Sequence, residues 1–257
     1  MENLKQTIYG KTAESLMSDL ENGGFEAVGK KVLEAANIEP RYLLEEQGER
    51  VFNESRVRLN SEAGLIIANH PGYYDTFAIL NTLKRSDVKI VVGAKNYETY
   101  KPILGEDLLI RASADPADGL AMIRSIKDHV ENGGVVIIYP SGGIDRAGKK
   151  NKSFDFQNGL SVILKRCLKP DDMVYSFYIE DEDIEAVVGE KISRIPGIVS
   201  AVAADPALNI NRLKERAVVR IDEKYSRAEE WQKISEGGAK DEKSEALREH
   251  FKDTFGK

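Results

Sequence analysis

Short apolar runs alternate with helix-length segments along most of this chain, and that alternation constrains the fold more than any other feature. Strand-type runs are expected at 64–69, 88–93, 133–140, 173–179 and 217–222. Helical patterns separate them at 75–83, 116–130 and 156–168, and two more helices follow to the end. Strands separated by helices predict an α/β fold, with a mostly parallel mixed sheet covered by helices on both faces.

The first 60 residues have a different character, because their apolar residues recur at helical spacing through 4–36. The Asn-Gly-Gly run at 22–24 is expected to break this pattern, and Pro40 is expected to open a third helical segment. We therefore predict an N-terminal helical region over 1–60 and an α/β domain over 61–257.

Charge, cysteine content and apolar run length restrict the classes of function and location. The 37 basic and 43 acidic residues give a net charge of −6, which disfavours a nucleic-acid partner. A single cysteine, Cys167, allows neither an internal disulfide nor a multi-cysteine zinc site, and its spacing predicts a core position. No apolar run reaches the ~20 residues of a membrane span, and the N-terminus lacks a signal-peptide pattern. We expect a cytoplasmic protein, soluble or peripherally associated with a membrane.

Two clusters of polar residues follow predicted strands. Each lies at the carboxyl end of its strand, which is where ligands bind in open parallel sheets. In the first cluster, Asn69 and His70 leave a buried strand, and Asp75 begins the next helix after a Pro-Gly turn. This spacing returns the carboxylate toward the imidazole. A histidine that a carboxylate holds on one nitrogen accepts a proton on the other. The pattern predicts a base-plus-orienter pair, the alternative being a turn histidine followed by an N-capping aspartate.

The second cluster is the glycine-rich and basic segment 139–150. Its turn presents backbone N–H groups to an anion, and Arg146, Lys149 and Lys150 add positive charge. The alternative is a flexible surface loop with solvated lysines. Residues 143–150 also imitate a nucleotide P-loop, but a lysine stands where magnesium requires Ser or Thr.

Arg111 is a third candidate. It follows a short apolar run, and we expect it either to reach the same cleft or to be an exposed arginine.

Together these clusters resemble the glycerolipid acyltransferase superfamily. Asn69, His70 and Asp75 match its Asn-His-x4-Asp motif, and residues 140–144 align with its Pro-Glu-Gly-Thr-Arg-like loop. Gly105 and Arg111 loosely match its Gly…Arg segment. The loop form Pro-Ser-Gly-Gly-x-Asp-Arg is similar to that of the soluble, plastid-type glycerol-3-phosphate acyltransferases.

The resemblance implies an O-acyltransferase that moves a fatty acyl group from acyl carrier protein or acyl-CoA to a hydroxyl of glycerol 3-phosphate. His70 would be the general base and Asp75 its orienting partner. The thioester would be a cosubstrate, with no metal and no bound cofactor. The implied acceptor or phosphate site comprises Arg111, Ser141, Gly142, Gly143, Arg146 and Lys149.

One departure from the plastid pattern leaves the acceptor open. Ile144 stands where that branch carries an arginine of the phosphate loop. The alternatives are another alcohol or amine acceptor, or a non-catalytic protein that binds an acyl chain or a nucleotide. We expect Lys149, Lys150 and Lys152 to form a basic patch that recruits an acidic acyl carrier protein.

Overall fold

The computed structural model of the chain describes residues 7–8, 11–36, 38–43, 49–71, 74–113, 115–143, 156–157, 159–180 and 217–256. Within these residues, β1 (Thr7–Ile8) and β2 (Lys11–Thr12) form a small antiparallel pair. A seven-stranded sheet, in the order β3-β9-β8-β4-β7-β5-β6, organises the rest. Its strands are β3 (Ile38–Tyr42), β4 (Gly64–Ala68), β5 (Val88–Gly93), β6 (Leu109–Ala112), β7 (Val135–Ile138), β8 (Met173–Glu180) and β9 (Ala217–Arg227).

Strand direction makes this sheet mixed but mostly parallel, which confirms the predicted fold class. Strands β8, β4, β7, β5 and β6 pair in parallel. Strand β9 runs antiparallel to β8, and β3 lies parallel to β9 at the edge. The central strands β4 and β7 are buried along their whole length, as expected for parallel strands covered on both faces.

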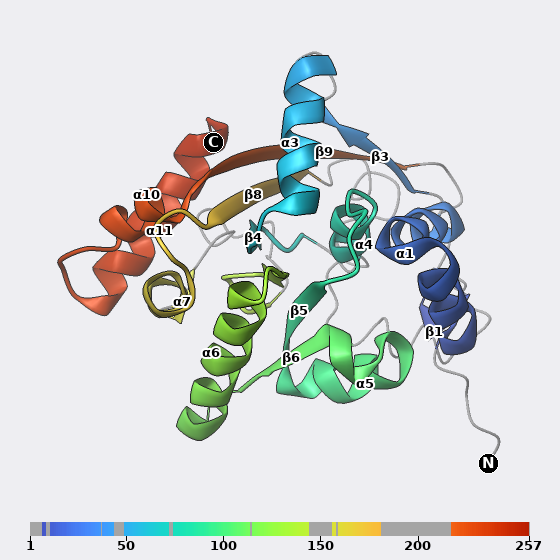
Figure 1. Cartoon of the computed structure of the whole chain (residues 1–257), viewed down its shortest axis with the longest axis horizontal. Coiled ribbons are helices and arrows are strands. Elements are labelled where there is room, and N and C mark those ends of the chain that lie inside the picture. The colour runs from blue at the N-terminus through green and yellow to red at the C-terminus, as the bar shows by residue number, and fades with distance from the viewer. Residues whose placement is uncertain are drawn as a thin grey trace.

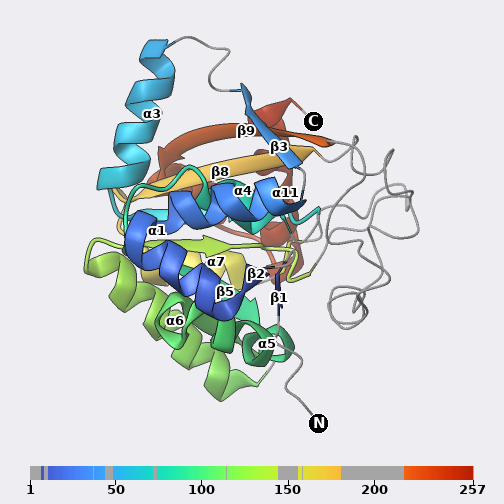
Figure 2. The same ribbon diagram turned by 90° about the vertical axis from the view of Figure 1, so that its right-hand side faces the viewer.

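Helices cover both faces of the sheet (Figures 1 and 2). One face carries α1 (Ala13–Ala36), α3 (Glu49–Ser61), α4 (Asp75–Leu80) and α5 (Ala94–Leu104), and the short 3-10 helix η1 (Glu106–Leu108) follows α5. The other face carries α6 (Pro116–Glu131), α7 (Gly159–Cys167), α10 (Ala228–Ile234) and α11 (Lys240–Phe255). Side chains of β4 alternate between the two cores: Ile66 packs on the first face, and Leu65 and Ile67 on the second.

Two glycines allow backbones to approach closely around β4. A Cβ on Gly64 would lie 2.1 Å from the Met173 carbonyl oxygen, so only glycine fits where β4 begins beside β8. A Cβ on Gly29 would lie 2.4 Å from the Asn81 nitrogen at the end of α4. The Gly64 contact lets β4 and β8 lie close together, and the Gly29 contact lets α1 approach the end of α4.

The N-terminal region departs from its prediction at Pro40. The expected break at 22–24 is confirmed, because α1 is interrupted at Gly24, which has φ 67° and ψ −166°. Residues 38–42, expected to begin a helix, form β3 instead. Proline is tolerated there because β3 is an edge strand, where a missing N–H need not disrupt a ladder.

The division of the chain at residue 60 stays a prediction. Side chains of α1 and β3, including Val32 and Ile38, share one core with residues of the α/β region. The strands β1 and β2 also depart from the helical pattern expected over 4–36, and α5, η1 and β6 were not expected from the sequence. Cys167 is buried, as predicted. No helix in the described ranges combines the length and apolarity needed to cross a membrane.

Candidate active site

Asn69 fixes the point at which the chain leaves β4. Its side-chain Oδ1 accepts from the Ile179 N–H at 2.7 Å, and its Nδ2 donates to the Ile179 carbonyl at 2.8 Å. The buried amide therefore continues the pairing of β4 with β8 for one residue beyond the strand. Both of its polar groups are satisfied, which a buried amide requires. This contact sets the direction in which the next residue, His70, enters the site.

His70 and Asp75 meet across the turn between β4 and α4. Nδ1 of His70 lies 2.5 Å from Oδ2 of Asp75, whose side chain is fully buried. The other oxygen, Oδ1, accepts from the Thr76 N–H at 2.5 Å and lies 3.3 Å from the Thr76 hydroxyl. An ionised carboxylate only accepts hydrogen bonds, so Nδ1 carries the proton. In the neutral ring, Nε2 then carries the lone pair that accepts a proton.

The capping alternative for Asp75 does not describe what its side chain does. Helix α4 has Tyr74 as its N-cap, without a side-chain capping bond, and Asp75 is the first helical residue. The Asp75 carboxylate instead divides its oxygens between His70 and Thr76.

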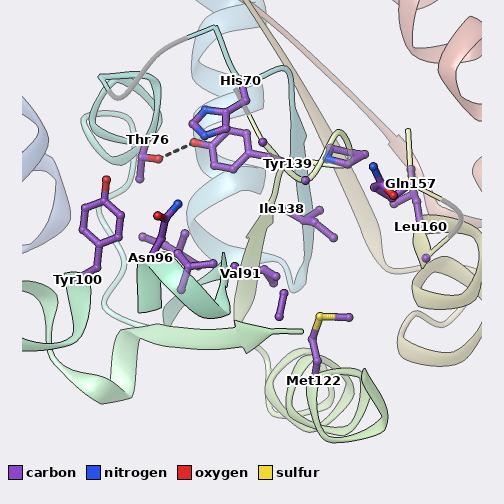
Figure 3. Close-up of a pocket in the computed structure, with 18 of the residues that line it drawn as sticks. His70, Thr76, Val91, Asn96, Tyr100, Met122, Ile138, Tyr139, Gln157 and Leu160 are labelled. Atoms are coloured by element: carbon purple, nitrogen blue, oxygen red, sulfur yellow. Dashed lines mark hydrogen bonds between the residues drawn. The ribbon is translucent and has the colours of Figure 1, made fainter. Parts of the chain in front are cut away.

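Tyr139 covers one face of the His70 ring. It directly follows β7, and the two rings stack with centroids 4.4 Å apart and planes inclined by 24°. Its hydroxyl forms a 2.7 Å hydrogen bond with Oγ1 of Thr76 (Figure 3). Burial of the hydroxyl, reinforced by the nearby Asp75 carboxylate, raises the pKa of Tyr139 well above its usual range. The phenol therefore stays protonated at neutral pH.

The site opens into a pocket of about 520 Å³ at the carboxyl ends of the parallel strands. His70 and Tyr139 lie at one end of it, and Met122 of α6 lies at the other (Figure 3). Polar side chains are few, with Thr76, Asn96 and Gln157 among them. The apolar wall comes from several elements: Phe77, Ile90, Val91, Val92, Leu104, Met122, Ile138, Leu160 and Ile163.

The described part of the glycine-rich loop borders this pocket. Gly142 and Gly143 line it, and Gly142 has φ 69°, a conformation that favours glycine. The Ser141 hydroxyl donates to the Gly143 carbonyl at 2.7 Å. Gln157 supports this loop through two hydrogen bonds, because its N–H donates to the Pro140 carbonyl and its side-chain amide to the Ser141 carbonyl.

The remaining predicted acceptor residues are not brought to this pocket by the described structure. Arg111 does not line it; its guanidinium donates to Asp118 at 2.7 Å and is 45% exposed. Of the two expectations for Arg111, the structure shows the exposed arginine and not the one in the cleft, and it pairs with Asp118 at the start of α6. Arg146 and Lys149, and with them most of the P-loop-like run, lie outside the described residues.

Three residues at the site were not singled out from the sequence: Thr76, Tyr139 and Gln157. The first two adjoin residues that were, since Thr76 follows Asp75 and Tyr139 begins the glycine-rich segment. Gln157 carries no local signal. Among the described residues, no group of His, Cys, Asp or Glu side chains has the arrangement of a metal site.

Comparison with known proteins adds a family and a fold. The crystal structure of the 1-acyl-sn-glycerophosphate (LPA) acyltransferase PlsC from Thermotoga maritima is similar, with a TM-score of 0.56 and 12% sequence identity over 95% of this chain and 80% of that chain. At that identity the similarity establishes the fold. A search of curated proteins gave no match. The sequence profile described as Acyltransferase matches residues 47–180. That span is more than half of the chain and includes His70, Asp75 and the Tyr139–Gly143 turn, so the chain belongs to the acyltransferase family.

Proposed function

We propose that this protein transfers a fatty acyl group from an acyl thioester to a hydroxyl of a glycerol phosphate acceptor, with His70 as general base. The observation that carries the proposal is the 2.5 Å contact between His70 Nδ1 and a fully buried Asp75 carboxylate at the edge of an apolar pocket. That contact orients the imidazole and stabilises its protonated form.

The proposed reaction needs one proton carrier. Nε2 of His70 takes the proton of the acceptor hydroxyl as its oxygen attacks the thioester carbonyl carbon. The C–O bond forms, and a tetrahedral intermediate collapses with cleavage of the C–S bond. The leaving thiolate takes the proton back from Nε2 and departs as the free thiol. Asp75 stays ionised throughout and balances the transient imidazolium.

The apolar part of the pocket suits the acyl chain. Its volume of about 520 Å³ falls within the range of roughly 300–1,000 Å³ that small-molecule sites occupy. The apolar wall runs from Ile138 beside the catalytic end toward Met122 (Figure 3). An acyl chain lying along this wall would place its thioester carbonyl near His70. Whether acyl carrier protein or CoA delivers the chain is part of the test.

The acceptor is proposed from two sources. The loop similar to that of plastid-type enzymes favours glycerol 3-phosphate, with Gly142, Gly143, Arg146 and Lys149 around the phosphate. The structural similarity to a 1-acyl-sn-glycerophosphate acyltransferase favours the monoacylated phosphate. Both acceptors share a phosphate beside a free hydroxyl, which is the chemistry that a glycine turn and an arginine recognise.

The test is thiol release from acyl-CoA and from acyl carrier protein, with glycerol 3-phosphate, 1-acylglycerol 3-phosphate and glycerol as acceptors. We expect release that requires a phosphorylated acceptor and is lost in His70→Ala. His129→Ala is the matched control, because His129 lies outside the pocket and contacts the Asp87 carbonyl. Thiol release that ignores the acceptor, or that survives His70→Ala, would overturn the proposal.

Arg146→Ala tests the phosphate assignment separately. Loss of one charge-assisted hydrogen bond, worth about 1.5–3 kcal/mol, should raise the KM of the phosphorylated acceptor by roughly 10- to 100-fold. The donor KM should change little. A change confined to the donor would remove Arg146 from the acceptor site.

A further inference from the structure

The His70 ring is held on two sides, at its edge by Asp75 and on its face by Tyr139. We propose that Tyr139, anchored by Thr76, is a positioning residue that sets the plane of the His70 imidazole and stabilises its protonated form. The inference rests on the proposed function in taking His70 as the general base. It assigns roles to two residues whose distance in sequence, 63 positions, hides their connection.

Hydrogen bonds connect Tyr139 to the carboxylate that holds His70. The Asp75 carboxylate only accepts, so the Thr76 hydroxyl at 3.3 Å donates to its Oδ1. The Thr76 hydroxyl also shares a 2.7 Å hydrogen bond with the Tyr139 hydroxyl, in which either oxygen can be the donor. The raised pKa of Tyr139 keeps its hydroxyl protonated at neutral pH. The Asp75 carboxylate thus connects to two groups at the imidazole: Oδ2 contacts its edge, and Oδ1 contacts Thr76, which bonds the ring stacked on its face.

Two constraints are needed because one hydrogen bond leaves a rotation open. The contact from Nδ1 to Asp75 fixes a line through the imidazole, and the ring can still turn about that line. Stacking at 4.4 Å and 24° removes this freedom, so Nε2 keeps one direction relative to the pocket. A misplacement of about 1 Å at a reacting group costs on the order of 100-fold in rate.

Stacking also has an electrostatic consequence. The face of an aromatic ring carries partial negative charge and attracts a cation within about 6 Å of its centroid. Once His70 accepts the proton, its imidazolium lies over the Tyr139 face. Removal of the ring should therefore lower the pKa of His70 and shift the pH–rate profile to lower pH, which loss of packing alone would not do.

Substitutions at the two anchoring residues separate these effects. Tyr139→Phe keeps the stack and loses the hydroxyl, and we expect kcat to fall by about 3- to 10-fold, as for one lost hydrogen bond. Tyr139→Leu loses the stack, and we expect a fall of about 100-fold. Thr76→Val should resemble Tyr139→Phe, and Thr76→Ser should restore most of the rate.

Two matched controls share the chemistry but not the position. Tyr175 donates its hydroxyl to the Arg58 carbonyl at 2.8 Å, and Thr82 donates to the Ile79 carbonyl at 2.7 Å. Neither lines the pocket. Tyr175→Phe and Thr82→Val should lower stability by amounts similar to Tyr139→Phe and Thr76→Val, with kcat unchanged.

Imidazole NMR tests the positioning without turnover. The chain has 3 histidines, so single His129→Gln and His250→Gln variants assign the His70 signals. We expect the His70 ring protons to be shifted upfield by the Tyr139 ring, the shift to persist in Tyr139→Phe, and both shift and His70 pKa to drop in Tyr139→Leu. Unchanged His70 signals and pKa in Tyr139→Leu would overturn the inference. These NMR signals report on the contact between Tyr139 and His70 even if no acceptor is acylated. Failure of the proposed acyl transfer can therefore be distinguished from failure of this inference.

Discussion

The two ends of strands β4, β5 and β7 carry polar clusters that are built in different ways. At the amino ends, the nearly buried Arg85 guanidinium donates to the carbonyl oxygens of Leu59, Glu62 and Gly133. Its remaining N–H groups donate to both carboxylate oxygens of Asp87. This amino-end cluster joins the residues that precede the three strands, and the Arg85 N–H groups donate to acceptors within the protein.

At the carboxyl ends, the polar side chains are supported from behind and open in front. Asn69 is held by the backbone of β8, and Asp75 by His70 and Thr76. His70 and Tyr139 then line the pocket. Like the first cluster, this carboxyl-end cluster is hydrogen-bonded within the protein, but it places a titratable ring at the edge of a pocket. Burial and hydrogen bonding are therefore common to both clusters, and adjacency to the pocket distinguishes the carboxyl-end cluster.

The largest expected effect that separates the clusters is loss of turnover in His70→Ala. Removal of a general base costs typically about 10²–10⁴-fold in rate. The free energy of unfolding should fall by about 1–3 kcal/mol, because Oδ2 of the buried Asp75 loses its donor while Oδ1 keeps the Thr76 N–H and hydroxyl. Initial rates of thiol release and thermal unfolding, measured on the same preparation, check both parts. An active His70→Ala enzyme would remove the chemical distinction between the two ends.

Arg85→Met should show the opposite pattern. It leaves the buried Leu59 carbonyl, the part-buried Glu62 and Gly133 carbonyls and the Asp87 carboxylate without this donor, which we expect to lower the free energy of unfolding by about 2–4 kcal/mol. Urea unfolding measures this loss. The kcat of the folded protein at low temperature should stay near that of the wild type, and a large drop in kcat there would contradict the assignment. Arg85→Lys, which keeps a charge but not the fork of donors, should give an intermediate loss of stability.

Asp75→Asn should lower kcat by about 100-fold with a smaller change in stability. If the Asn carbonyl faces the Thr76 N–H, its NH2 group faces Nδ1 of His70 and can only donate. The ring must then hold its proton on Nε2, the wrong nitrogen for a base. Kinetics and the imidazole nitrogen shifts of His70 test rate and tautomer together. Equal activity would reduce Asp75 to a structural residue like Asp87.

The smallest expected effect is the pH dependence contributed by Asp87. The hydrogen bonds and charge of Arg85 lower the pKa of Asp87 below its usual value near 3.9. A lowered pKa stabilises the folded protein above the unfolded-state pKa, and this contribution is lost as the pH falls through the folded-state value. Wild type should therefore exceed Asp87→Asn in stability at neutral pH, with the gap closing below about pH 4. The side chain is 47% exposed, so solvent screening limits the gap to roughly 1 kcal/mol or less. A gap that widened on acidification would reverse this account.

Residues close in sequence account for most of what could be predicted. Strands β4, β5, β7, β8 and β9 and helices α4, α6 and α7 follow from periodicity, and the pairing of His70 with Asp75 from a turn of a few residues. The acyltransferase class expected from these motifs is confirmed by the family. The resemblance to plastid-type enzymes, the donor and the acceptor stay predictions. The missed elements β3 and β6 are short edge strands, where neighbouring strands rather than local pattern decide the conformation.

The sequence by itself determined the alternation of strands and helices, the turn that joins His70 to Asp75, and the chemical class of the site. Only the tertiary structure decided which groups surround that pair. Tyr139 reaches Thr76 because β7 lies beside β4, and Asn69 reaches Ile179 because β8 lies on the other side. The tertiary structure also places Arg111 beside Asp118 rather than in the pocket. The physical reason is that periodicity and turn chemistry act over a few residues, whereas the order of strands in a sheet is set by how whole faces pack.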